Sequence, residues 1–406
     1  MLPDHAGGRP EAMTGAAPLA PYACRAGQSR GRKRPESESP TRTAFQRDRD
    51  RVIHSVAFRR LKHKTQVFVY HEGDHYRTRL THSIEVAQIA RSISRILGLD
   101  EDLAEALALA HDLGHTPFGH AGEDALDEVM APYGGFDHNE QTFRILTTLE
   151  RRYAEFDGLN LTWETLEGVV KHNGPLSAAD GIPSSISEFC RTFDLELGTY
   201  AGGEAQVAAL SDDIAYNNHD IDDGLRAGVF AVRDLDDVPL VGPIFAHVAA
   251  RYPGLDEPRL IHESIRRLID HMVTDLLVET RARLAALNPR SAQDIRAAGT
   301  PVVAFSERMR DNDRALKAFL FARMYRHERV IRMIAAARDV VQELFELYMS
   351  DPSHLPAEWQ AGVASQDNVV RARLVADYIA GMTDRFALAE HRRLTGKRNE
   401  DIDEPV

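Results

Sequence analysis

The chain has 406 residues, 43% of them hydrophobic, and this length accommodates one large domain or two ordinary ones with a sizeable core. The formal net charge of -13 argues against a general nucleic-acid coat or an anionic membrane surface as the main partner. Only two cysteines occur, Cys24 and Cys190, so neither a disulfide framework nor a thiolate metal site is indicated. No apolar run approaches the roughly 20 residues that cross a bilayer, and no signal pattern begins the chain, so we expect a cytoplasmic protein.

Residues 1–40 are rich in Gly, Pro, Ala, Arg and Ser and lack apolar periodicity, which predicts a disordered, basic N-terminal tail. Its basic piece, Arg30 to Arg34, is compatible with weak contact to single-stranded nucleic acid, but a solvated tail is the simpler interpretation. Between residues 30 and 79, fourteen Lys and Arg stand against six Asp and Glu. In an acidic protein this local excess predicts attraction for phosphate groups.

From Thr41 onward the pattern is helical, and little strand character is found, so we expect an all-α fold. One short β-hairpin is predicted where residues 65–70 alternate β-branched and aromatic side chains before a turn at Gly73. The expected organisation is a helical core over residues 41–235, a C-terminal helical region packed on it over 236–392, and a frayed tail over 393–406.

A helix is predicted from Thr81, its N-cap, to about Leu97, with Ile84 on the inner face and His82 in the first turn. The next helix, residues 101–113, contains the most apolar run of the chain, LAEALALA, and should be buried.

That buried helix leads into residues 111–123, HDLGHTPFGHAGE, which hold three histidines, an aspartate and a glutamate. Unpaired polar or ionised groups in an apolar interior cost several kcal/mol each, and a metal ion compensates that cost. Adjacent His111 and Asp112 offer an imidazole nitrogen and a carboxylate oxygen, which together suit Mn, Mg, Fe or Zn.

Later segments supply further candidates. A helix over residues 162–172 ends at His172, which we interpret as complementing the helix dipole. Asp212, Tyr216 and Asp220 recur every four residues on one helical stripe and resemble the wall of a site. Tyr325 stands near an apolar stripe, where a core position is the alternative.

The candidate ligands of one cation come from three helices, and their number leaves coordination positions open for water and substrate, as catalytic sites do: His82, His111, Asp112 and Asp212. Taken alone, His82 is also explained as a capped surface histidine, and Asp212 as an acidic residue near a helix N-terminus. A bound cation lowers the pKa of water toward about 7, and the basic surroundings indicate phosphorus as the electrophile.

The other titratable residues of the stretch suit proton transfer. Glu123 follows His120 by three residues, a spacing that lets it hydrogen-bond the imidazole, raise its pKa and hold it as a general acid. His115 and His138 would then donate to phosphoryl oxygens. No GxxxxGK or GxGxxG motif occurs, so a nucleotide is not held by a P-loop or a dinucleotide-type fold.

These residues resemble the HD superfamily of metal-dependent phosphohydrolases, defined by His, then His-Asp, then Asp. Within it the chain is most similar to the deoxyguanosine triphosphate triphosphohydrolase family, in its bacterial dGTPase-like branch. The likeness runs from about Thr41 to Met333 and is carried by six segments in order: FQRDRDRVIHSVAFRRLKHKTQVF, RTRLTHSIEVAQIAR, HDLGHTPFGHAGEDAL, GFDHNEQ, SDDIAYNNHD and MYRHERV.

The resemblance implies an all-helical HD core, a divalent cation (Mn or Mg, with Co, Fe or Zn as alternatives), and cleavage of a dNTP, dGTP favoured, into deoxynucleoside and inorganic triphosphate. It makes His82, His111, Asp112 and Asp212 the metal ligands and His120 with Glu123 the catalytic pair. It also assigns the substrate contacts: Arg79, His115 and His138 to the α-phosphate, Tyr216 and Asp220 to the sugar, and Tyr325 to the base or sugar.

One position departs from the family pattern. Where animal relatives carry a lysine for the triphosphate, this chain has Asp213, so the distal phosphates must be bound otherwise, for which Arg59, Arg60 and Lys64 are the candidates.

Two other functions remain as hypotheses: an HD enzyme acting on another nucleotide, and a nucleotide- or single-strand-binding regulator with little turnover. Family members assemble into tetramers or hexamers, so a homo-oligomer is expected, and an allosteric nucleotide is compatible with the resemblance. No membrane partner is expected.

Overall fold

The structure, a computed structural model, describes residues 18–66, 77–177, 181–363 and 367–397. Within these ranges it consists of helices and connecting segments, and the β-pairing is limited to two isolated bridges, Arg32 with Thr162 and Thr65 with Thr78. The predicted all-α fold is therefore confirmed. The predicted hairpin over residues 65–70 falls largely outside the described residues.

The α-helices that the structure describes are α1 (Ala44–Ile53), α2 (Val56–Arg60), α3 (Arg79–Leu97), α4 (Glu101–Ala110), α5 (Gly119–Met130), α6 (His138–Arg144), α7 (Trp163–Val170), α8 (Ser184–Cys190), α9 (Gly203–Arg226), α10 (Val241–Arg251), α11 (Glu257–Leu287), α12 (Ala292–Arg296), α13 (Glu307–Leu320), α14 (Glu328–Ser350), α15 (Ala357–Val363), α16 (Asn368–Ala380) and α17 (Asp384–Thr395). Short 3-10 or π turns extend or connect several of them.

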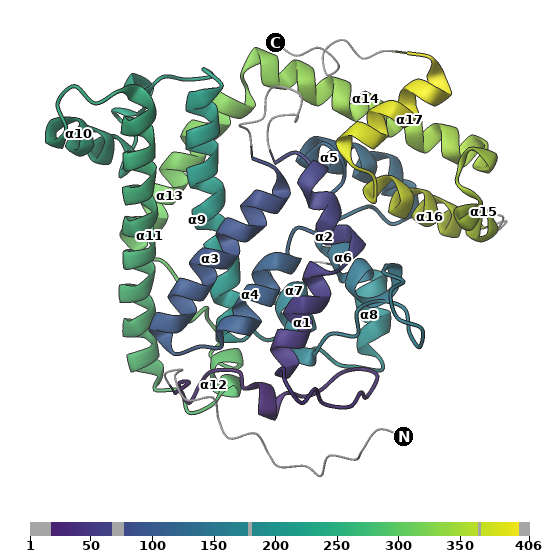
Figure 1. The fold of residues 1–406 in the computed structure, drawn as a ribbon, viewed down its shortest axis with the longest axis horizontal. Helices are drawn as coiled ribbons and strands as arrows, with labels where there is room; N and C mark the ends of the chain where they lie inside the picture. The colour runs from purple at the N-terminus through teal and green to yellow at the C-terminus, as the bar shows by residue number, and fades with distance from the viewer. Residues whose placement is uncertain (1–17, 67–76, 178–180, 364–366, 398–406) are drawn as a thin grey trace, which may run out of the picture.

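The centre of the molecule is α4, which packs against α1, α3, α7 and α9 (Figure 1). Its alanines and leucines are buried on all sides, and the Asp100 side chain caps its N-terminus by accepting from the Leu103 N–H. Each buried leucine contributes about 1.5–3 kcal/mol relative to an exposed one. This helix therefore ends inside the protein, where His111 and Asp112 follow it.

Helices after residue 236 surround this centre on two sides (Figure 1). The long helix α11 packs along α9, and its Met272 and Leu276 join the central apolar cluster. Helices α14, α16 and α17 form a second cluster with α5. The C-terminal helices thus cover α5 and α9, the two elements that carry His120 and Asp212.

Helix α3 begins three residues earlier than predicted, because Thr78 rather than Thr81 is its N-cap. His82 is buried, which argues against the alternative of a capped surface histidine, whereas Ile84 is 52% exposed, so its predicted place on the inner face is wrong. The last helix, α17, extends to Thr395, and the predicted frayed tail lies mostly in residues 398–406, outside the described part.

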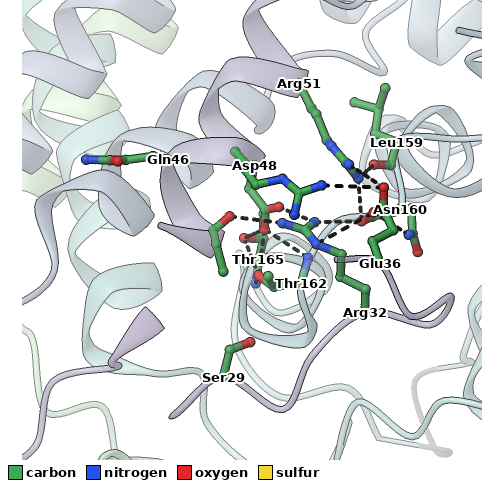
Figure 2. Close-up of polar contacts among 12 residues, drawn as sticks. Ser29, Arg32, Glu36, Gln46, Asp48, Arg51, Leu159, Asn160, Thr162 and Thr165 are labelled. Carbon is green, nitrogen blue, oxygen red and sulfur yellow. Dashed lines mark hydrogen bonds and ion pairs between the residues drawn. The ribbon is translucent and has the colours of Figure 1, made fainter. Parts of the chain in front are cut away.

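The prediction that residues 1–40 form a disordered tail is wrong for residues 18–40, which lie against the core (Figure 2). Asp48 of α1 is fully buried and accepts hydrogen bonds from the Arg32 guanidinium, from the Thr162 N–H at 2.9 Å and from the Thr165 hydroxyl at 2.7 Å. The Asp48 carboxylate therefore joins residues 18–40, which we call the N-terminal arm, to α1 and to the start of α7. Composition alone misled the prediction, because it does not show that Arg32 is paired with Asp48 in the interior rather than solvated.

A second carboxylate extends the same network (Figure 2). Glu36 accepts from the Arg51 guanidinium at 2.8 Å and from the Asn160 amide at 2.8 Å. Arg51 also donates to the Leu159 carbonyl. Because these donors and acceptors satisfy one another away from water, we call Arg32, Glu36, Asp48, Arg51 and Asn160 the arm network.

Among the described residues, no helix combines the length and the apolar character that crossing a membrane requires.

Removing the Asp48 carboxylate should destabilise the protein strongly. In Asp48→Ala the buried Arg32 guanidinium loses its charged partner and the Thr162 N–H loses its acceptor, a change that costs about 3–5 kcal/mol. Arg42→Ala, which breaks an exposed pair with Asp50, should cost at most about 1 kcal/mol. Urea unfolding of both variants measures the difference. Equal losses in the free energy of unfolding would show that the arm network does not stabilise the protein as a buried set of contacts.

Candidate metal and phosphate site

The start of α3 and the end of α4 each bring a histidine to the carboxylate of Asp212, which lies on one face of α9. His82 in the first turn of α3 places Nε2 2.8 Å from Asp212 Oδ1, and His111, directly after α4, places Nε2 3.5 Å from the same oxygen. Ligand atoms of these three residues all lie within 4.8 Å of one another. The structure thus brings together three of the four predicted ligands, and each of the three comes from a different helix.

Asp112, the fourth predicted ligand, lies beside this group. Its Oδ1 is 2.9 Å from the Arg79 guanidinium and 3.4 Å from His111 Nε2, whereas its Oδ2 is buried without a hydrogen-bond partner. Burial raises the pKa of the Asp112 carboxyl, but Arg79 and His111 outweigh burial and hold it well below its usual range. The carboxylate is therefore ionised with one oxygen uncommitted.

The donor set fits a divalent cation. His111 Nδ1 donates to the Ala108 carbonyl at 2.7 Å, so Nε2 is the nitrogen that faces the Asp112 and Asp212 carboxylates, buried and without a hydrogen-bond partner. A buried imidazole nitrogen and a buried carboxylate oxygen that both lack a partner are costly, and a cation between them removes the cost. Mixed nitrogen and oxygen donors suit Mn, Fe or Zn, and Mg with more oxygen ligands.

The sequence analysis missed two histidines of this cluster. His172 was interpreted as complementing a helix dipole, yet its Nε2 lies 3.5 Å from Asp212 Oδ2 and its ring stacks on His111. His219 was not singled out, and its Nδ1 lies 3.1 Å from His82 Nδ1. Its spacing was the available signal, because His219 follows Asp212 by seven residues, two turns along the same face of α9.

A second cluster of titratable groups surrounds Glu123 of α5. Its carboxylate lies 3.2 Å from His120 Nδ1, 2.7 Å from His138 Nδ1 and 3.7 Å from His115 Nδ1. Burial raises the pKa of Glu123, but the contacts with His120 and His138 lower it far more. His120 is the exposed member at 55%, whereas His115 is buried, so only His120 presents most of its ring outward.

Two backbone features allow these side chains to meet. Gly114 packs so closely against α6 that a Cβ there would lie 2.1 Å from the His138 carbonyl oxygen, and this approach brings His138 to Glu123. Phe118 and Gly119 both have positive φ, 64° and 60°, and they turn the chain into α5. The motif residue Gly114 is thus required for packing rather than for chemistry.

Arg79 links the two clusters. Its side chain is 1% exposed and donates to Asp112, while Nε and one terminal nitrogen are buried without a partner. His115 Nε2 lies 3.2 Å from the same Asp112 oxygen. Unused guanidinium donors beside an imidazole form a site for an anion such as a phosphate group.

A pocket opens next to His120, with the aromatic pair Tyr216 and Tyr325 on its wall. The two phenol oxygens lie 2.7 Å apart, and the Tyr325 hydroxyl donates to Asp220. Burial raises the pKa of Asp220 to about 8. The predicted wall of Asp212, Tyr216 and Asp220 is therefore one face of α9. The full lining comprises Gln66, Phe118, His120, Ala121, Tyr216, Tyr325, Val330, Met333, Ile334 and Ala337.

On the other side of Asp212 lies a larger cavity of about 590 Å³, lined in part by His172, Asp213 and Asp313. Lys317 of α13 pairs with both Asp213 and Asp313 at 3.0 Å. A lysine therefore does lie beside the position where the family pattern predicts one, but it comes from another helix.

The expectation that Lys64, Arg59 and Arg60 bind phosphate is not supported by their contacts. Lys64 is buried, and its ammonium donates to the backbone carbonyls of His115 and Ala380. Burial lowers the pKa of Lys64 to about 7. Arg59 donates to carbonyls of its own helix region, and Arg60 lies against Gly381, so neither contacts a residue of the two clusters through these groups.

Comparisons with known proteins agree with this geometry. The HD domain profile matches residues 79–217, which include every predicted ligand, and a phosphohydrolase-associated domain matches residues 303–393. Three relatives carry the name deoxyguanosinetriphosphate triphosphohydrolase-like protein. That of Parvibaculum lavamentivorans is 64% identical and covers 93% of this chain and 96% of its own. Those of Cereibacter sphaeroides and Azorhizobium caulinodans are 59% and 60% identical, over 93% and 94% of this chain and 100% and 98% of theirs.

Replacing Asp212 should abolish cation binding. Because its carboxylate lies between His82 and His111, Asp212→Ala should weaken Mn²⁺ binding by more than roughly 100-fold. This loss exceeds the roughly 10–100-fold that follows removal of a residue that only orients a ligand. Asp213→Ala is the matched control, since it removes the neighbouring carboxylate that faces Lys317. Titration calorimetry with Mn²⁺ measures both, and equal affinity in the two variants would place the cation elsewhere.

Proposed function

Because the chain belongs to the family of deoxyguanosinetriphosphate triphosphohydrolase-like proteins, we propose that it cleaves a deoxynucleoside triphosphate into a deoxynucleoside and inorganic triphosphate. The chain is a hydrolase of the HD phosphohydrolase type. The proposal is supported mainly by buried polar atoms that have no hydrogen-bond partner, namely His111 Nε2, Asp112 Oδ2 and two nitrogens of Arg79. They lie near a pocket whose wall includes Tyr216 and Tyr325.

The α-phosphate is proposed to lie between the two clusters. When bound, a divalent cation neutralises phosphate charge and acidifies water. His82, His111, Asp112 and Asp212 would hold that cation. Arg79 offers its unused guanidinium donors, and His115 and His138 lie on the opposite side, stacked with ring centroids 4.0 Å apart. This arrangement gives an α-phosphoryl group donors that stabilise charge as it develops.

The proposed reaction breaks the bond between the α-phosphorus and the 5′-oxygen of the deoxynucleoside. Water supplies the oxygen that joins phosphorus, and the leaving 5′-oxygen takes a proton from His120. Glu123 lies 3.2 Å from His120 Nδ1 and thereby orients the ring for this transfer. The half-exposed position of His120 at the mouth of the pocket leaves its Nε2 edge available for this transfer.

The nucleoside is proposed to occupy the pocket beside His120. Tyr216, Tyr325 and Asp220 form a hydrogen-bonded row on one side, which suits the sugar and its 3′-hydroxyl. The opposite side is apolar, with Val330, Met333 and Ile334. A base there is held by stacking and shape, together with Gln66 of the lining, whose buried Oε1 has no hydrogen-bond partner.

The distal phosphates are proposed to extend toward Asp212 and Lys317. Lys317 pairs with Asp213 and Asp313, which line this cavity, and Lys171 and Arg310 are the basic residues of the lining itself. Assembly into a tetramer or hexamer and activation by a second nucleotide stay predictions from the family resemblance, as does the choice among Mn, Mg and other divalent ions.

The released phosphate identifies the reaction. With Mn²⁺ and dGTP as substrate, we expect inorganic triphosphate and deoxyguanosine in equal amounts, measured by ion chromatography. Because attack at the β- or γ-phosphorus releases pyrophosphate or orthophosphate instead, either of these as first product would show that the chain is an HD enzyme of another specificity. Comparison of the four dNTPs in the same assay ranks the bases.

Loss of the His120 imidazole should slow the chemical step without weakening cation binding. His120→Ala removes the proposed proton donor, and a positioned general acid contributes about 10²–10⁴-fold to kcat. Its Mn²⁺ affinity should match that of the unaltered protein. His354→Ala removes a histidine of the C-terminal region that pairs only with Asp351 and should leave kcat unchanged. Full activity of His120→Ala would remove His120 from the mechanism.

A further inference from the structure

Behind His82 a chain of hydrogen bonds leads away from the proposed cation. His82 Nδ1 lies 3.1 Å from His219 Nδ1 on α9, and His219 Nε2 contacts the carboxylate of Glu85, one turn after His82 on α3. Arg77 Nε lies 3.7 Å from the same Glu85 carboxylate. Both imidazoles are 1% exposed, so their nitrogens have no water to exchange protons or hydrogen bonds with.

The positions of the protons follow from which atoms can donate. An ionised carboxylate only accepts, so His219 Nε2 carries the proton that it shares with Glu85. A neutral imidazole has a single N–H, which makes His219 Nδ1 an acceptor and His82 Nδ1 its donor. His82 Nε2 lies 2.8 Å from Asp212 Oδ1, so a cation that binds there displaces the proton between these two atoms, while the Nδ1 proton stays in the hydrogen bond to His219.

The competing arrangement would prevent cation binding. If His219 donated from Nδ1 as well, it would be a buried cation near the Arg77 guanidinium, and His82 would carry its proton on Nε2, between the ring and Asp212. A nitrogen that carries a proton cannot be a metal ligand. The two arrangements therefore differ in how readily His82 Nε2 gives up its proton to a cation, because only the first keeps a proton on Nδ1.

We propose that Glu85 and His219 are positioning residues that fix the tautomer of His82 and thereby set the cation affinity of the site. Neither residue contacts the proposed cation or the substrate. The inference rests on the proposed function only in that a cation binds among His82, His111 and Asp212.

Three variants separate tautomer control from simple packing. His219→Leu fills much of the space but offers no acceptor, and should weaken Mn²⁺ binding about 10–100-fold, the range for a residue that orients a ligand. His219→Asn keeps an oxygen near the place of Nδ1 and should restore most of the affinity. Glu85→Ala changes a side chain that is 45% exposed, so the fold should persist while the affinity falls about 10-fold.

The matched control is His391→Leu. His391 is a buried histidine whose Nε2 lies 2.9 Å from Glu343, on α17 and α14 rather than at the metal cluster. It removes the same kind of His–Glu pair, so it should lower the melting temperature without changing the affinity for Mn²⁺.

The measurement is the fraction of free Mn²⁺ by electron paramagnetic resonance on the full chain, with the melting temperature followed by circular dichroism. Unaltered affinity in both His219→Leu and Glu85→Ala would overturn the proposal. If His219→Leu does not fold, Glu85→Ala and His219→Asn decide it: weak binding in the first with near-normal binding in the second supports it, and any other combination overturns it. Absence of Mn²⁺ binding by the unaltered protein would instead remove the metal site and the proposed function.

Discussion

The ionised carboxylate of Asp212 is the interaction that holds the site together. Burial raises its pKa, yet contacts with His111, His172 and His82 hold that pKa well below its usual range. Those imidazoles come from the ends of three other helices, so a single partly buried negative charge requires α3, α4, α7 and α9 to meet at one point. Apolar packing brings the helices together, but it tolerates small sliding movements, whereas a charge with three partners at hydrogen-bonding or ion-pair distance does not.

The contacts of Asp112 connect the residues around Asp212 to a second group of titratable residues. Arg79 and His115 share one oxygen of Asp112, and this shared contact joins the cation cluster to the group around Glu123. The two groups of residues therefore keep a fixed spacing, as a reaction at one phosphorus requires of a cation and a proton donor. Gly114 makes this possible by letting α6 approach the end of α4, so a residue without a side chain decides where His138 lies.

Local patterns predicted much of this arrangement, and non-local pairing explains what they missed. Helical spacing places Asp212, Tyr216 and Asp220 on one face, a feature that depends only on neighbours in sequence. The pairing of His219 with Glu85 and of Arg32 with Asp48 depends on tertiary packing that composition does not encode. The contacts of Lys64 were missed for a related reason, because counting charges does not reveal burial, and its ammonium donates to two backbone carbonyls.

The arm network has a consequence for how the chain is made. Arg32 and Asp48 emerge from the ribosome early, but the Asn160 carbonyl that Arg32 also contacts follows 128 residues later. At about 5–20 residues per second, the arm waits roughly 6–26 seconds for that partner. During this interval its charged groups are hydrated at no cost, unlike an apolar segment that would adhere to other nascent chains. Charged contacts thus suit a segment that is synthesised early but reaches its final contacts late.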